Sequence, residues 1–157
     1  MKARPAPSVK GRALRYLSQR EHSRAELERK LARHVEDTPE ASAASRIAKA
    51  LDELAERDLL SERRAAEAVV TAQPPRFGTA KLRPAMHPYA FVPTASDAAL
   101  AVVAGTELER ARDVWRRKFG AAATDAAGRA RQARFLASRG FGADVIRRLV
   151  RGLDVDD

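Results

Sequence analysis

Basic side chains are the residues of this sequence whose type and spacing point to chemistry. Guanidinium and ammonium groups bind the oxygens of phosphates and carboxylates, and arginine does so through paired hydrogen bonds. We predict a partner- or nucleic-acid-binding site made of Arg116, Arg117, Lys118, Arg129, Arg131, Arg139, Arg147 and Arg148. Electrostatics does not separate DNA from an acidic protein partner here, and the alternative is a solvated face that only aids solubility.

The net charge of +9 is distributed unevenly over the 157 residues. Residues 1–20 carry +6 and residues 106–151 carry +7, whereas residues 21–73 and residues 152–157 each carry −3. Two basic segments of this size would attract a polyanion, and nucleic acid is the commonest one. DNA, single- or double-stranded, is therefore an expected partner.

Groupings of residues that could catalyse a reaction or bind a metal do not stand out. His22, His34 and His87 lack the spacing of metal ligands, and the chain has no cysteine to join them. Ser23 and Glu26 fit a helix-capping box better than a nucleophile with its base. We therefore predict a protein that is not an enzyme and has no cofactor and no metal.

The sequence also lacks an apolar run near the roughly 20 residues that span a bilayer. The absence of cysteine fits a reducing compartment. We expect a soluble, cytoplasmic monomer without a membrane partner.

Two stretches near opposite ends of the chain follow the same plan, since Tyr16–Ser23 aligns with Phe135–Gly142. Each is the end of an apolar helix, a short turn around an arginine, and the start of a second amphipathic helix. Such a unit cannot bury its apolar stripe alone, so the repetition predicts an all-α array of stacked helices. An array of this kind presents an elongated surface to a partner.

Apolar spacing and capping residues predict the positions of seven helices. They begin near residues 11, 23, 41, 61, 106, 125 and 143. The capping boxes are Ser23–Glu26 and Thr106–Glu109, and Asp58 falls in a turn where glycine would be easier. The side chains expected to face the interior near the C-terminal end are Leu108, Ala111, Trp115, Phe119, Ala130, Ala133 and Leu136. Trp115 and Phe119, with Phe135 and Phe141, are expected in the core rather than stacked on bases.

Five of the eight prolines lie between residues 74 and 93. An interior proline costs a helix about 3 kcal/mol, so we expect irregular backbone over residues 74–95. Within and beside it, Arg76–Arg83 has the pattern of a short turn and helix start, and Ser96–Val103 that of another short helix.

A further signal comes from four segments, Ala13–Leu31, Leu51–Ser61, Glu109–Gly120 and Arg134–Phe141. Together they resemble the RecX family, regulators of the RecA recombinase. The resemblance implies nine helices in three tandem three-helix modules that form an elongated, curved array. It also implies a non-enzymatic inhibitor that binds the RecA–DNA filament and modulates homologous recombination, DNA repair and the SOS response. The alternatives are a helix-turn-helix-like DNA-binding protein that acts independently of RecA, and a structural adaptor.

The resemblance and the helical pattern together predict the domain boundaries. The segments are a basic tail (1–10), a first module (11–57), a middle module (58–105, irregular over 74–95), a third module (106–152) and an acidic tail (153–157). The interruption in the middle suggests a pair of compensating frameshifts that bracket about residues 82–96.

Overall fold

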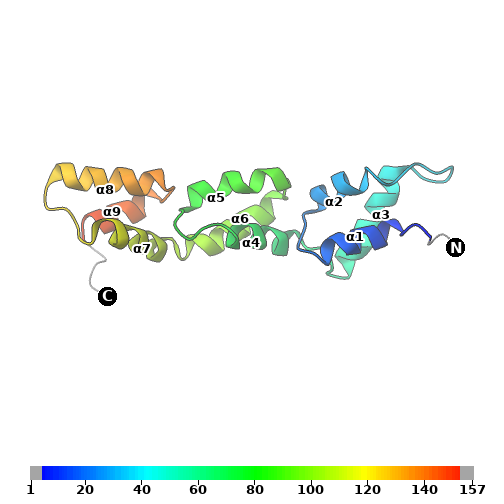
Figure 1. The fold of residues 1–157 in the computed structure, drawn as a ribbon, viewed down its shortest axis with the longest axis horizontal. Coiled ribbons are helices and arrows are strands. Elements are labelled where there is room, and N and C mark those ends of the chain that lie inside the picture. The colour runs from blue at the N-terminus through cyan, green and yellow to red at the C-terminus, as the bar shows by residue number, and fades with distance from the viewer. Residues whose placement is uncertain (1–4, 153–157) are drawn as a thin grey trace. The chain divides into compact units, whose positions relative to one another are not determined.

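The computed structural model describes residues 5–152, and every regular element in this range is a helix (Figure 1). The α-helices are α1 (Val9–Leu17), α2 (Arg24–Leu31), α3 (Ala43–Glu56), α4 (Glu62–Thr71), α5 (Thr79–Met86), α6 (Pro93–Ala104), α7 (Glu107–Phe119), α8 (Ala126–Ser138) and α9 (Ala143–Val150). A 3-10 helix, η1, covers His87–Tyr89. The expected all-α fold of three-helix repeats is confirmed. No helix in the described range is long and apolar enough to cross a membrane.

The chain forms two compact units, each described by itself. Unit 1 holds the residues up to Ala68 together with His87–Ala95. Unit 2 holds Val69–Met86 together with the chain from Ser96 onward.

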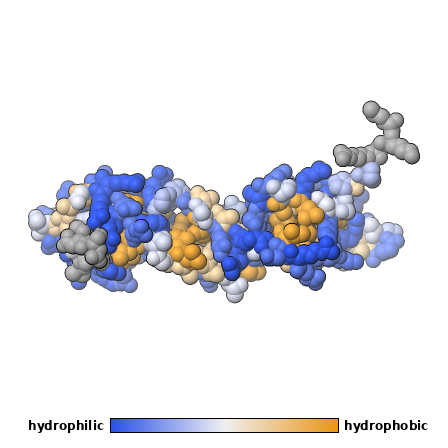
Figure 2. Space-filling view, turned by 90° about the horizontal axis from the view of Figure 1, so that it is seen from below, coloured by the Kyte–Doolittle hydropathy of each residue, from blue (hydrophilic) through white to orange (hydrophobic). Residues whose placement is uncertain are grey.

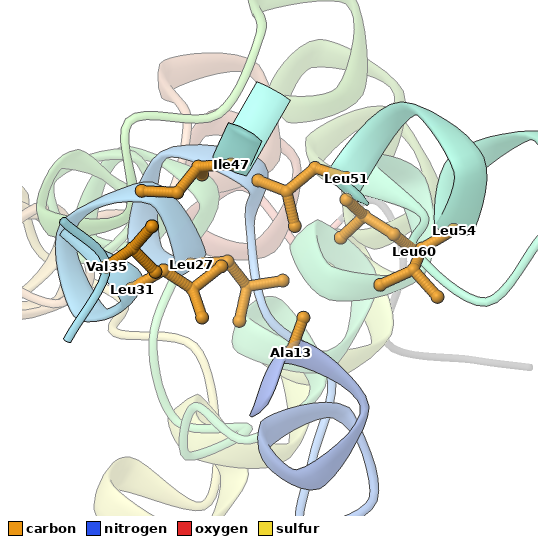
Figure 3. Close-up of a cluster of buried hydrophobic side chains, with 8 residues drawn as sticks. All are labelled: Ala13, Leu27, Leu31, Val35, Ile47, Leu51, Leu54 and Leu60. Carbon is orange, nitrogen blue, oxygen red and sulfur yellow. The ribbon is translucent and has the colours of Figure 1, made fainter. Parts of the chain in front are cut away.

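The core of unit 1 lies among α1, α2 and α3. Figure 3 shows its side chains pointing toward one another. The members on α2 and α3 are spaced by three or four residues, which places them on one face of each of these two helices. Leu27, Leu31, Leu51 and Leu54 have no exposed surface. Burying one such side chain contributes about 1.5–3 kcal/mol, so this cluster supplies the main stabilisation of the first repeat.

The start of α2 carries half of the predicted capping box. The Ser23 hydroxyl accepts a hydrogen bond from the N–H of Glu26 at 3.1 Å, as predicted. The Glu26 carboxylate does not return to Ser23, because it is paired with the guanidinium of Arg20. The Ser23 hydroxyl also donates a hydrogen bond to the Tyr89 carbonyl, which ties α2 to η1.

The third repeat, α7 to α9, packs around Trp115, Leu136 and Leu149, all fully buried. The inner face of α8 differs from the prediction, since Ala130 is exposed and Gln132 is buried. The Gln132 Oε1 accepts a hydrogen bond from the Trp115 Nε1–H at 3.1 Å. A buried amide and indole thus satisfy each other, which removes the cost of burying either.

The second predicted capping box, Thr106–Glu109, is wrong. Thr106 precedes α7, but its hydroxyl donates a hydrogen bond to the Val103 carbonyl at 3.1 Å and makes no cap bond. It also accepts a hydrogen bond from the Arg110 Nε. The hydroxyl therefore closes the preceding turn instead of starting α7.

The expectation of irregular backbone over residues 74–95 is also wrong, because α5, η1 and the start of α6 lie there. The helix start expected within residues 76–83 and the short helix expected over residues 96–103 are confirmed as parts of α5 and α6. Pro93 is the first residue of α6, where a missing N–H costs nothing. Pro84 does lie inside α5, where it removes one helical hydrogen bond. Burial of Leu82 and Met86 offsets that loss. Since helices form here, the main reason to suspect frameshifts is removed.

Backbone contacts with the third repeat anchor the start of α5. The Gly78 N–H donates to the Arg139 carbonyl at 2.8 Å, and the Ala80 N–H donates to the Gly140 carbonyl at 3.2 Å. A side chain at Gly78 would overlap the backbone of Gly140 and Phe141. Glycine is therefore required at residue 78 by the close approach of two backbones.

A glutamate at the start of one repeat also caps a helix of the repeat before it. In unit 1 the Glu62 carboxylate, at the start of α4, accepts hydrogen bonds from the N–H groups of Arg24 (2.6 Å) and Val92 (3.1 Å). In unit 2 the Glu107 carboxylate, at the start of α7, accepts from the N–H of Thr79 at 2.9 Å. The same device therefore joins successive repeats twice.

A buried polar cluster in unit 1 surrounds His22. Its Nδ1 lies 3.0 Å from the Arg20 carbonyl, and its Nε2 lies 3.0 Å from the Lys30 ammonium. Both contacts suit a neutral ring that donates through Nδ1 and accepts through Nε2. Burial lowers the pKa of His22 below its usual 6.5, and the nearby cations act in the same direction.

We predict that Gly78→Ala lowers the free energy of unfolding by about 1–3 kcal/mol, because the new methyl group must displace backbone. Urea denaturation of the full chain measures this loss. Gly11→Ala in α1 is the control, since its nearest obstacle is the Ser8 hydroxyl and alanine favours the helix. Equal losses in both variants would show that the Gly78 contact is not required.

We predict that His22 makes unit 1 sensitive to acid. A histidine whose folded pKa is lowered contributes stability above its unfolded pKa, and that stability falls as pH drops below about 6.5. His22→Gln should therefore reduce the drop in melting temperature between neutral pH and about pH 5, as measured by thermal unfolding. His34→Gln, at an exposed residue, should retain the parent's pH profile. An unchanged profile for His22→Gln would contradict this role.

Candidate partner-binding surface

The described surface is mostly polar, so charge is the main feature that a partner can recognise. On the face drawn in Figure 2, hydrophilic residues cover most of the area and hydrophobic ones gather in a few patches. The exposed large apolar side chains of the described residues are Leu14, Leu59, Val92 and Val102.

The predicted triplet Arg116, Arg117 and Lys118 is exposed in the last turn of α7. Trp115, which precedes it, is fully buried. The helix therefore presents its apolar side to the core and the triplet to solvent. Cations in a last turn also interact favourably with the negative end of the helix dipole.

Lys118 and Arg139 both lie against the ring of Phe135. The Lys118 Nζ is 5.9 Å from the ring centroid and the Arg139 Cζ is 5.2 Å from it. Phe119 meets the same ring edge-on, with centroids 5.3 Å apart. Cation–π contacts restrict long basic side chains, so less entropy is lost when they bind an anion.

Phe77 forms a second group of the same type. Arg76 and Lys81 lie against its ring, with the Arg76 Cζ at 5.1 Å and the Lys81 Nζ at 5.7 Å from the centroid. The backbone bond from Gly78 to Arg139 places this group beside the Phe135 group. Arg76 also lines a small pocket together with Arg117.

These contacts define one cationic area of unit 2, which we call the cation–aromatic surface. It consists of Arg76, Lys81, Arg117, Lys118 and Arg139, with Phe77 and Phe135. Within the described residues, no ion pair to a carboxylate is formed by these five cations. Their charges are available to an anion from outside the unit.

The remaining predicted residues lie elsewhere on unit 2. Arg129 and Arg147 line a groove between α8 and α9, together with Arg151. Arg131 on α8 and Arg148 on α9 are exposed and line neither this groove nor the pocket beside Arg117. Arg116 is exposed next to Arg117 on α7. The structure thus brings together only part of the predicted set.

Arg110 shows that some cations of this region are structural. Its guanidinium donates to the Phe77 carbonyl and, at 3.1 Å, to the Val103 carbonyl. Burial lowers the pKa of Arg110, although the carboxylate of Glu107 opposes this effect. Arg110 therefore ties α7 to the chain around Phe77 and is not offered to a ligand.

Sequence reasoning missed Arg76 and Lys81. A signal was present, since both lie within four residues of Phe77, but the expected irregular backbone hid it. The contact between residues 78 and 139 is not visible in any local pattern. Within residues 5–152, no group of three or more His, Cys, Asp or Glu side chains could hold a metal ion.

Comparisons with known proteins give the family of this chain. The regulatory protein RecX of Leptothrix cholodnii is 48% identical over 151 residues, covering 96% of this chain and 92% of that protein. The chain belongs to the RecX family. The RecX protein of Herminiimonas arsenicoxydans is 41% identical and covers 96% of this chain and 95% of its own.

Family profiles and solved RecX structures agree with this assignment. The profile of the third three-helix domain of RecX matches residues 106–150, and that of the first matches residues 10–44. The crystal structure of RecX from Lactobacillus salivarius has a TM-score of 0.71 and 18% identity, and the match covers 94% of this chain and 95% of that one. This structural likeness shows the shared fold. The relatives are named regulatory proteins.

Proposed function

We propose that this RecX-family protein regulates a RecA recombinase, and that it inhibits RecA by binding the RecA–DNA filament rather than by catalysing a reaction. The family membership over nearly the whole chain supports the RecA partner. The observation that carries the contact with the filament is the cation–aromatic surface, which offers five cations to an anion.

The chemistry of this surface fits phosphate better than stacked bases. The faces of Phe77 and Phe135 are approached by cations, and Trp115 is buried, so these rings do not form a free stacking platform. Held cations instead suit the regular negative charges of a nucleic-acid backbone. Contacts of this type position a protein without reading sequence, as a filament regulator requires.

The eight residues predicted from sequence have different parts in this proposal. Arg117, Lys118 and Arg139 form the surface with Arg76 and Lys81, and Arg116 extends it along α7. Arg131 and Arg148 add to the long-range attraction. Arg129 and Arg147 belong to the separate groove between α8 and α9.

RecA ATPase activity on single-stranded DNA tests the proposed function. We expect the protein to lower the steady-state rate, because a regulator bound along the filament restricts its active length. A rate unchanged at excess protein would contradict inhibition. A sequence-specific footprint on duplex DNA without any effect on RecA would instead identify the helix-turn-helix-like alternative.

Charge reversal tests the surface itself. We predict that Arg76→Glu/Lys81→Glu and Arg116→Glu/Arg117→Glu/Lys118→Glu both weaken binding to oligo(dT) and to RecA filaments, with helicity retained. Each lost phosphate contact should flatten the log–log salt dependence for single-stranded DNA by about 0.7. Fluorescence anisotropy over a salt titration measures both the affinity and the slope.

Arg33→Glu/Lys49→Glu is the matched control for the first variant, since it makes the same change in net charge at exposed residues of unit 1. An equal loss in this control would show that total charge, and not the surface, drives binding. Loss of RecA affinity with unchanged DNA binding would place carboxylates of RecA, rather than phosphates, against these cations.

A further inference from the structure

Tyr89 and Phe91 form a stacked pair of aromatic rings in unit 1. The ring centroids are 5.5 Å apart and the ring planes are inclined by 16°, so the rings are nearly parallel. Both side chains are half-buried, and neither belongs to the hydrophobic core among α1, α2 and α3. Part of the ring area is therefore open to solvent.

This pair differs from the two aromatic groups of unit 2. Cations lie against the rings of Phe77 and Phe135. Among the described residues of unit 1, no cation is stacked on Tyr89 or Phe91. Ring area without a cation can accept another flat π-system, and two nearly parallel rings already set the orientation in which a third ring extends the stack.

Hydrogen bonds to the backbone hold the pair on both sides. The Ser23 hydroxyl donates to the Tyr89 carbonyl, and the Val92 N–H donates to the Glu62 carboxylate at 3.1 Å. Between them, Ala90 has a φ of +47°, in the left-handed region that a residue with a side chain rarely adopts. Strain of this kind persists only where surrounding contacts enforce it, and it concentrates at binding sites. Rings ordered in advance lose less entropy when they bind.

Arg29 adds a cation next to the rings. Its guanidinium donates to the carbonyl of Pro88, the residue before Tyr89, at 2.8 Å. Arg29 is exposed, and within the described residues it forms no ion pair with a carboxylate. A guanidinium has five N–H donors, so others remain for the oxygens of a phosphate.

Flat rings beside an arginine match the two parts of a nucleotide, its base and its phosphate. The bases of a single strand can be splayed out and stacked on aromatic side chains, whereas the bases of a duplex are stacked on one another. We propose that Tyr89 and Phe91 stack on a base of single-stranded nucleic acid while Arg29 binds a neighbouring phosphate.

This site in unit 1 is separate from the cation–aromatic surface of unit 2. The inference rests on the proposed function for nucleic acid as the ligand, and it adds a contact with bases to the phosphate contacts of unit 2. Because every base has a π-face, the contact does not select a sequence. It does favour single strands over duplexes.

Photocrosslinking tests the stacking directly. Oligo(dT) that carries 5-iodouracil in place of thymine is irradiated with the full chain in the absence of RecA, and crosslinked peptides are identified by mass spectrometry. We expect crosslinks at Tyr89 or Phe91. The only other tyrosine of the chain, Tyr16, is the internal control, because it packs against the core and the Lys30 Nζ lies 4.9 Å from its ring centroid. No crosslink at either ring, or an equal yield at Tyr16, would overturn the proposal.

Phe91→Leu separates stacking from apolar contact. It keeps an apolar side chain but removes a ring, and it should weaken binding to oligo(dT) about tenfold with helicity and the salt slope retained. An abasic strand of the same length should bind the parent and the variant equally. Val92→Ala is the control, since it removes exposed apolar area next to the rings without removing a ring. Equal losses in Phe91→Leu and Val92→Ala, or an equal loss with the abasic strand, would contradict stacking.

Arg29→Gln tests the phosphate contact. It should flatten the log–log salt dependence for oligo(dT) by about 0.7, whereas Arg15→Gln makes the same charge change at an exposed residue of α1 and should not. An unchanged slope in Arg29→Gln would overturn this contact. If Phe91→Leu retained oligo(dT) affinity but lost RecA filaments, the rings would contact protein and the proposal would fail. The charge-reversal variants of unit 2 leave these rings intact, so their failure and failure here are distinguishable.

Discussion

The joints between successive repeats depend on a carboxylate shared at each repeat boundary. Glu62 begins α4 and caps the start of α2, and Glu107 begins α7 and caps the start of α5. The first N–H groups of a helix have no partner within it and carry a positive partial charge, so an ionised carboxylate is well suited to them. In an isolated three-helix repeat, the second helix would lack this glutamate cap. Each boundary therefore stabilises both the joint and a helix within the repeat.

Helices with a local apolar pattern could be predicted from the sequence, whereas a helix that depends on contacts between repeats could not be predicted in full. The helices α1 to α4 and α7 to α9 were predictable because leucines and other apolar residues recur at spacings of three or four. Only the start of α5 was indicated, by the turn and helix start over residues 76–83, because Pro84 lies inside the helix and its support comes from elsewhere in the chain. Hydrogen bonds from Gly78 and Ala80 to Arg139 and Gly140 join residues about sixty positions apart. Tertiary contacts of this kind override local helix propensity, and no local pattern reveals them.

The same limit applies to the candidate site. The dense charge of Arg116, Arg117 and Lys118 identified one part of the site. Trp115 is buried as expected, so the triplet faces solvent. Arg76 and Lys81 join it only because the backbone at Gly78 meets the turn after α8. Gln132 was missed for a related reason, since a polar residue on a helix is expected to face solvent. Its burial follows from the indole N–H of Trp115, which needs an acceptor inside the core.

Contacts, more than charge density, separate the roles of the many arginines in unit 2. Arg110 donates to two backbone carbonyls and is partly withdrawn from solvent, so its charge serves the fold. Arg139 lies on an aromatic face, which restrains the side chain, and it forms no ion pair with a carboxylate of the described residues. Arg151 has neither kind of contact among the described residues. A net charge counts these three arginines equally, although only the latter two can respond to an anion. The charge that unit 2 offers to a partner therefore depends on which guanidinium groups are already hydrogen-bonded to backbone carbonyls.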